Sequence, residues 1–101
     1  MASRLKLQTE LENLLGSRNV YFQPPASVQM KYPAIRYSLS DVLSNHADDT
    51  VYKYMKAYEL IVIDPNPDSE YPDKLLQFKY CRFDRYYTSD NLNHYVFTLY
   101  Y

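Results

Sequence analysis

The residues that could support acid–base or metal chemistry are few, and they are poorly spaced for it. His46 lies in an acidic segment with Asp48 and Asp49, whereas His94 lies between an expected turn and an expected strand. Zinc and calcium sites need ligands at short, regular intervals, and the segment that starts at Asp41 lacks the central glycine of a calcium loop. We therefore expect solvated polar residues here, with no metal ligands and no cofactor.

Nucleophilic catalysis has as little support in the sequence. Cys81 has alternating apolar neighbours, which favours a buried packing thiol over a reactive thiolate. The serines at positions 38, 40 and 44 do not occur in the context of a nucleophile elbow. One cysteine cannot form an internal disulfide, which favours folding in a reducing cytoplasm. The sequence predicts that the protein is not an enzyme.

Length and charge limit the remaining classes. The 101 residues predict a single domain over residues 1–101, and the formal net charge of −1 is not the basic balance of a nucleic-acid binder. The single glycine, Gly16, argues against loops that cradle phosphate groups. Because no apolar run is long enough to span a bilayer, we expect no membrane association. From the net charge we expect no specific nucleic-acid binding.

Tyrosine is strongly enriched, with 13 Tyr and no Trp. Most tyrosines are expected to fill the core and the strands, because aromatic residues fit a pleated surface. The remainder suit a protein interface, since tyrosine joins an apolar ring to a polar tip. Several aromatic residues surround an expected turn, and one lies on the central strand. The predicted interface residues are Tyr58, Tyr86, Tyr87, Asp90, Asn91 and Tyr95.

Leucines at helical spacing predict an amphipathic helix over residues 3–15. Leu7, Leu11, Leu14 and Leu15 lie on one face, and Gly16 follows where a helix commonly ends in the left-handed conformation. Ser3 is the expected N-cap.

The rest of the chain predicts strands and one short helix. In the segment 32–39, Ile35, Tyr37 and Leu39 alternate with Ala34, Arg36 and Ser38, as in a half-buried strand. In the segment 80–87, Cys81, Phe83, Arg85 and Tyr87 are expected opposite Arg82, Asp84 and Tyr86. We predict an α+β fold of about five mainly antiparallel strands, with an N-terminal helix and a short helix between the later strands. The expected strands cover residues 19–23, 32–39, 54–64, 80–87 and 95–101, and the short helix residues 72–77.

Two features of the pattern suggest contacts with other molecules. The runs 60–63 and 96–99 are apolar on both faces, which predicts central strands covered by the N-terminal helix on one side and by a partner on the other. The acidic segment 40–50 is expected to be a loop or a ragged hairpin arm. It either connects the strands in solvent, or projects so that Asp41, Asp48 and Asp49 meet another subunit or line a pore.

Taken in order, these elements resemble the small tail-terminator or tail-completion proteins of tailed phages and prophages, including minor-capsid-like proteins. The resemblance covers nearly the whole chain. It rests on the helix end Leu14-Leu15-Gly16 and on the segments 19–25, 31–37, 58–64 and 86–101. The expected helix at 72–77 is shorter than the helix usual after the central strand in that family.

The resemblance implies a structural subunit of the virion, made in the host cytoplasm. It would form a ring, typically a hexamer, that caps the tail tube and joins it to the head-side connector, with DNA passing through. The implied partners are further copies of the chain, the tail tube protein and a connector or neck protein. Two alternatives stay open: a monomeric protein-binding module, such as a small inhibitor of a host factor, and another neck protein.

Overall fold

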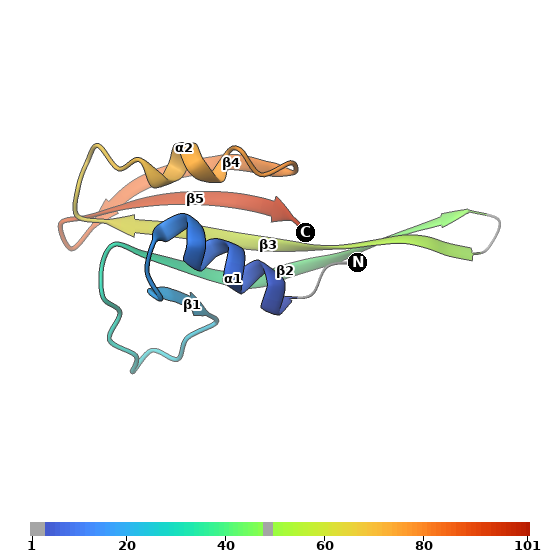
Figure 1. Cartoon of the computed structure of the whole chain (residues 1–101), viewed down its shortest axis with the longest axis horizontal. Helices are drawn as coiled ribbons and strands as arrows, with labels where there is room; N and C mark the ends of the chain where they lie inside the picture. The colour runs from blue at the N-terminus through green and yellow to red at the C-terminus, as the bar shows by residue number, and fades with distance from the viewer. Residues whose placement is uncertain (1–3, 48–49) are drawn as a thin grey trace.

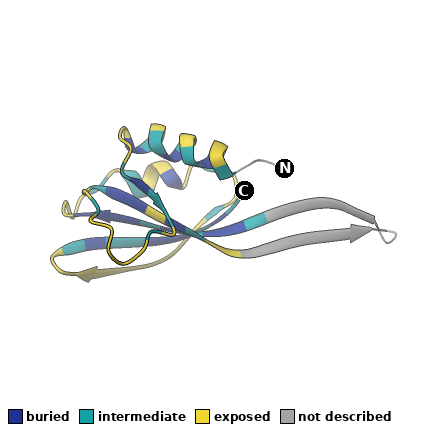
Figure 2. Cartoon of the chain, turned by 90° about the horizontal axis from the view of Figure 1, so that it is seen from below, coloured by how far each residue is buried: buried dark blue, intermediate teal, exposed yellow. Residues whose placement is uncertain are grey.

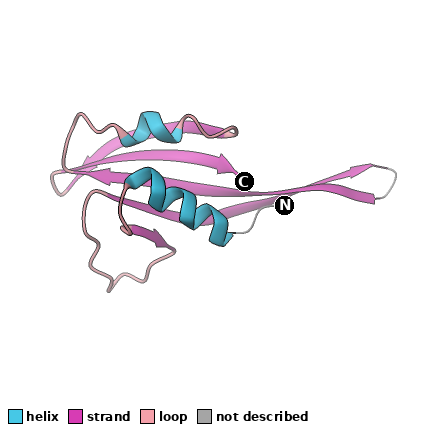
Figure 3. Ribbon diagram, viewed as in Figure 1, coloured by secondary structure: helices cyan, strands magenta, loops and turns pink. Residues whose placement is uncertain are grey.

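The computed structural model describes residues 4–47 and 50–101, and its elements confirm the predicted α+β fold (Figure 3). The short helix falls between the third and fourth of five strands, as expected. In chain order the elements are α1 (Arg4–Leu15), β1 (Val20–Phe22), β2 (Ala34–Ala47), β3 (Thr50–Asp64), α2 (Tyr71–Leu75), β4 (Cys81–Ser89) and β5 (Leu92–Tyr100).

The strands form a mixed sheet in the order β1-β2-β3-β5-β4 (Figure 1). Only β1 pairs in parallel, with β2, and the other three pairings are antiparallel. The two apolar runs lie on β3 and β5, two of the three inner strands of the sheet, as the pattern predicted. Both helices cover the same side of the sheet (Figure 2), so its opposite side carries no helix.

Helix α1 packs on the sheet through a leucine stripe that matches the helical repeat. Leu7, Leu11 and Leu15 recur every four residues, so they share one face, and all three are buried. Gly16 ends the helix with φ of 77°, and its N–H donates to the carbonyl of Glu12 at 2.9 Å. The predicted N-cap Ser3 lies outside the described residues.

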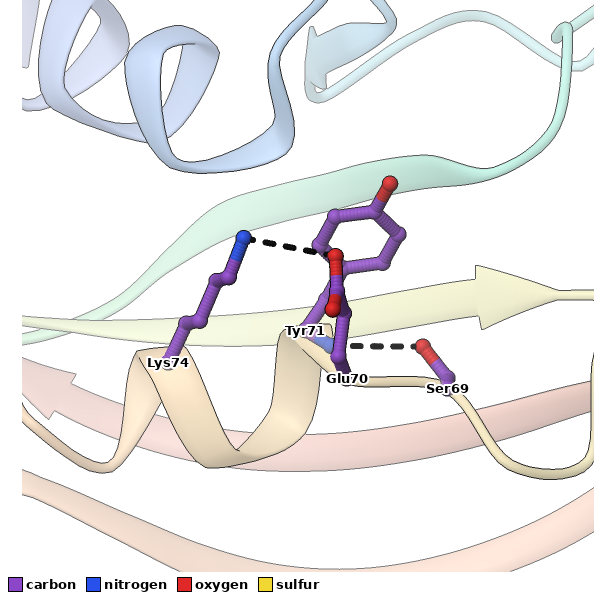
Figure 4. Close-up of polar contacts among 4 residues, drawn as sticks. All are labelled: Ser69, Glu70, Tyr71 and Lys74. Atoms are coloured by element: carbon purple, nitrogen blue, oxygen red, sulfur yellow. Dashed lines mark hydrogen bonds and ion pairs between the residues drawn. The ribbon is translucent and has the colours of Figure 1, made fainter.

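Helix α2 is short and begins in a polar turn (Figure 4). The hydroxyl of Ser69 accepts a hydrogen bond from the backbone N–H of Tyr71 at 3.4 Å. One turn along the helix, Lys74 forms an ion pair with Glu70 at 3.4 Å. Leu75 anchors the helix in the core next to the leucines of α1. The exposed ion pair adds little stability, so the burial of Leu75 holds the helix in place.

The two longest strands extend into the segment predicted as a loop. Pairing continues through Val42 with Lys56 to Ala47 with Thr50, with irregularities after Leu39 and after Asn45. Of the two structures expected for this segment, the hairpin arm is therefore confirmed. The arm projects beyond the rest of the sheet (Figure 1).

The core lies between the helices and the sheet. Tyr37, Tyr58 and Phe97 are large buried side chains that the strands contribute to it. Leu39 was expected to join Ile35 and Tyr37 but is 43% exposed. Arg4, the first described residue of α1, donates to the Tyr37 hydroxyl at 3.2 Å, and Leu39 lies two residues further along β2. Among the described residues, no helix has the length and apolar character needed to cross a membrane.

Candidate functional site

The side of the sheet opposite the helices, called here the open face, brings together polar, basic and aromatic side chains from four strands. Strand pairing aligns them in rows, since paired residues point to the same side. The rows are Ala34, Ile63, His94 and Tyr87; then Arg36, Ile61, Val96 and Arg85; then Ser38, Glu59, Thr98 and Arg82.

A β-bulge in β4 decides which of its side chains reach the open face. The register shifts between Phe83 and Arg85, so Asp84 has no separate partner on β5. One extra residue reverses the alternation beyond it. The sequence-based prediction that Phe83, Arg85 and Tyr87 share one face is therefore wrong. Phe83 packs edge-on against the core residue Phe97, with ring centroids 5.4 Å apart.

Asp84 also links the open-face residues of β4 and β5. Its carboxylate accepts a hydrogen bond from the Thr98 hydroxyl at 2.5 Å and from the Arg82 Nε–H at 3.2 Å. The bond to Thr98 ties the bulge in β4 to the neighbouring strand β5. The bond from Arg82 means that part of the positive charge of Arg82 is already compensated.

The open face also carries a stack of two rings. Tyr87 and His94 lie with centroids 4.6 Å apart and ring planes 10° apart. The guanidinium of Arg85 lies 6.0 Å from the Tyr87 ring centroid. The His94 Nδ1 is 3.2 Å from the carbonyl oxygen of Leu92. A carbonyl only accepts, so this contact requires the proton on Nδ1 and leaves Nε2 of the neutral ring as an acceptor.

Charge within the three rows of the open face and the neighbouring bulge residue Asp84 is mixed, with a positive balance. Arg36, Arg82 and Arg85 supply three guanidinium groups against the two carboxylates of Glu59 and Asp84. Arg36 and Arg85 occupy the two ends of one row, on β2 and β4, with the apolar Ile61 and Val96 between them. This row can contact an anionic chain at two points.

The predicted aromatic cluster is divided between the two sides of the sheet. Tyr86 and Tyr95 contact each other on the helix side, with ring centroids 5.0 Å apart. Tyr95 donates to the carbonyl of Pro67 at 3.1 Å, and burial raises its pKa. Tyr87 alone of the three reaches the open face. Tyr58 is 2% exposed and belongs to the core.

The remaining predicted interface residues form a turn. Asp90 and Asn91 have φ of 53° and 62°, and they connect β4 to β5 as the two residues of a tight hairpin turn. They fix the register that aligns Tyr87 with His94. Asp41 lies in β2 opposite Ala57, whereas Asp48 and Asp49 lie outside the described residues.

Cys81 packs at the edge of the core. Burial, with a smaller effect of the Asp84 carboxylate, raises the pKa of its thiol to about 11. The thiol is therefore protonated at neutral pH, as a packing residue would be. Within residues 4–47 and 50–101, no group of three or more His, Cys, Asp or Glu side chains is arranged to hold a metal ion.

A separate cavity of about 460 Å³ opens beside the end of β5. Glu10, Phe78, Tyr80, Leu99 and Tyr101 are among its lining residues. The Tyr101 hydroxyl donates to the Glu10 carboxylate and so connects the end of the chain to α1. Burial, followed by this hydrogen bond and the charge of Glu10, raises the pKa of Tyr101 to about 12.

Comparison with known proteins gives one likeness at the level of sequence. Over 72 residues, 70% of this chain, it is 32% identical to Ribonuclease VapC4 of Methanocaldococcus jannaschii. The chain spans about half of that protein, 54% of its length. No family model matches the chain. No solved structure matches it.

This likeness contradicts several predictions made from the sequence. A relative named as a ribonuclease conflicts with the phage tail-terminator role, with the virion location and with the prediction of a non-enzymatic protein. The residues that carried the resemblance define strands and turns, which unrelated proteins share, so they were a weak guide to function. The predicted self-association and its partners stay untested.

Proposed function

We propose that this chain acts on RNA as part of a ribonuclease, and that the open face holds a single-stranded segment of the substrate. The name of the relative supports the substrate class. The observation that carries the proposal is the alignment of Arg36 and Arg85 at the two ends of one row, beside the stacked rings of Tyr87 and His94.

Arginine suits the phosphate part of this interaction. A guanidinium presents several N–H donors in a planar fork and binds phosphate oxygens in pairs. Arg36 and Arg85 are separated by β3 and β5, hence by three strand spacings of about 4.8 Å each. A row of this length can follow the backbone of a short extended strand and contact more than one phosphate.

The stacked rings suit the bases. Tyr87 is 37% exposed, so part of its surface is available to a ligand. Proteins that bind single strands combine a basic track with aromatic side chains on which unpaired bases stack. A duplex keeps its bases stacked on one another, and a sheet face of this shape would meet only its backbone. The arrangement therefore favours unpaired RNA.

The overall charge of −1 does not oppose this function. The three described rows of the open face, with the bulge residue Asp84, carry three arginines and two carboxylates, so the charge there is positive although that of the whole chain is not. With few phosphate contacts, the affinity should be modest and should weaken as the salt concentration rises.

Binding to a short fluorescent single-stranded RNA tests the proposal. The double variant Arg36→Ala, Arg85→Ala should bind at least about tenfold more weakly. The slope of log affinity against log salt should become shallower by about 1.4, because two phosphate contacts contribute about 0.7 each on a single strand. The matched control is Arg18→Ala, Lys74→Ala, which removes the same charge from exposed positions between α1 and β1 and on α2. An equal loss of RNA affinity in both double variants would show that only the net charge matters, and it would contradict an RNA site on the open face.

A further inference from the structure

We propose that His94 is the general base that takes the proton from a ribose 2′-hydroxyl when this chain cleaves RNA. This inference rests on the proposed function, because it requires RNA on the open face. It goes beyond that function by assigning a reaction and a single atom, Nε2 of His94.

The first support is the way the ring is held. The contact of Nδ1 with the Leu92 carbonyl at 3.2 Å requires a hydrogen on Nδ1, so Nε2 carries the lone pair in the neutral ring. A general base needs an unprotonated nitrogen that faces the substrate, and this hydrogen bond selects the tautomer that supplies it. The bond joins His94 to a residue on its own strand, so the tautomer is fixed locally.

The second support is the fixed orientation of the imidazole plane. Tyr87 lies parallel to it at 4.6 Å, so the stack and the Nδ1 hydrogen bond together restrict rotation of the ring. His94 is only partly buried, so part of the residue is accessible from solvent. A base held in this way needs little reorganisation before it can accept a proton.

The third support is the adjacent positive charge. Arg85 pairs with Val96, two residues along β5 from His94, so it is a diagonal neighbour on the same face. Its guanidinium also lies by the Tyr87 ring, at 6.0 Å. Negative charge grows on the phosphate oxygens as the 2′-oxygen attacks, and a guanidinium within reach stabilises it.

The reaction is a transesterification with no change in oxidation state. The 2′-O–H bond breaks, the proton moves to Nε2 of His94, and the 2′-oxygen forms a bond to phosphorus. The P–O5′ bond then breaks, and the departing 5′-oxygen takes a proton from water. The products are a 2′,3′-cyclic phosphate and a 5′-hydroxyl, and the imidazolium returns its proton to water.

The test compares the full chain with His94→Asn and His94→Gln at saturating single-stranded RNA, with a chelator present. The asparagine amide can still donate to the Leu92 carbonyl, and the glutamine keeps a side chain of similar length, so both retain part of the structural role. Both should cleave about 10²–10⁴-fold more slowly, the usual contribution of a general base. An RNA with one 2′-deoxy nucleotide should stay intact at that position, and the products should carry cyclic phosphate ends.

The outcomes separate this inference from the proposed function. If the wild type binds RNA but leaves it intact, or if His94→Asn cleaves at the wild-type rate, the assignment of His94 is wrong and RNA binding stands. Cleavage at the 2′-deoxy position, or products with 3′-hydroxyl ends, would also overturn it. If the wild type does not bind RNA, both proposals fail.

Discussion

Tyr87 on β4 and His94 on β5 stack with their ring planes 10° apart, and the bulge at Asp84 makes this contact possible. Without the extra residue, strand alternation would place Tyr87 on the helix side together with Phe83. The same shift brings Arg85 to the open face. A single irregularity in one edge strand therefore builds most of the candidate site.

Replacing Tyr87 with alanine should weaken RNA binding by about 1–3 kcal/mol, the usual value of one base–aromatic stack. Stability should change little, because the side chain is substantially exposed. Tyr86→Ala is the matched control, since it removes the preceding tyrosine of the same strand from the helix side. Fluorescence anisotropy with both folded variants checks this. An equal loss of RNA affinity in the two variants would contradict a specific stack of a base on Tyr87.

The leucine stripe of α1 should carry a large share of the stability. Leu11 is 0% exposed and Leu5 on the same helix is 66% exposed. Leu11→Ala should lower the free energy of unfolding by about 2–5 kcal/mol through lost burial and a cavity. Leu5→Ala should change it by less than about 0.5 kcal/mol. Urea unfolding measures both, and similar costs in the two variants would show that α1 is not packed as described.

The Cys81 thiol should resist modification in the folded protein. Its pKa is raised to about 11, so far less thiolate is present at pH 8 than in an unfolded chain. A thiol reagent should therefore react at least about tenfold more slowly before unfolding than after it. The rate should climb as the pH approaches 11. Equal rates in folded and unfolded protein would place the thiol in solvent.

The Tyr101–Glu10 hydrogen bond should make stability depend on alkaline pH. The folded pKa of Tyr101, about 12, lies above the usual value of 10, so its contribution is complete below pH 10 and is lost as the pH rises toward 12. Tyr101→Phe should cost about 1 kcal/mol at neutral pH. The difference between variant and wild type should shrink over that alkaline range. A difference that stays constant to pH 12 would mean that Tyr101 does not titrate as described.

Much of the fold follows from local pattern. The leucine repeat and Gly16 define α1, and the two apolar runs identify β3 and β5 as inner strands of the sheet. The acidic segment 40–50 was harder to interpret, since its mostly polar sequence shows no clear alternation that would distinguish a strand from a loop. The parallel pairing of β1 with β2 depends on a contact between distant segments, which periodicity does not reveal.

The site was harder to predict than the fold. Arg36 could be assigned to the side opposite Ile35, but its alignment with Arg85 requires the strand order. That order places β5 between β3 and β4, against their order in the chain. The bulge then shifts Arg85 and Tyr87 to the other side, and a bulge arises from pairing with a partner strand. The net charge of the chain also gives no indication of the arginines, because they come together only in the folded sheet.

Side-chain resonances followed during titration with single-stranded RNA test the central claim most directly. The account predicts that the signals of Tyr87, His94 and Arg85 shift together and saturate at one affinity. The signals of Phe83 and Tyr86, on the helix side of the same strand, should remain near their free positions. Shifts centred on the helix side, or no shifts at RNA concentrations that saturate binding, would contradict an RNA site on the open face.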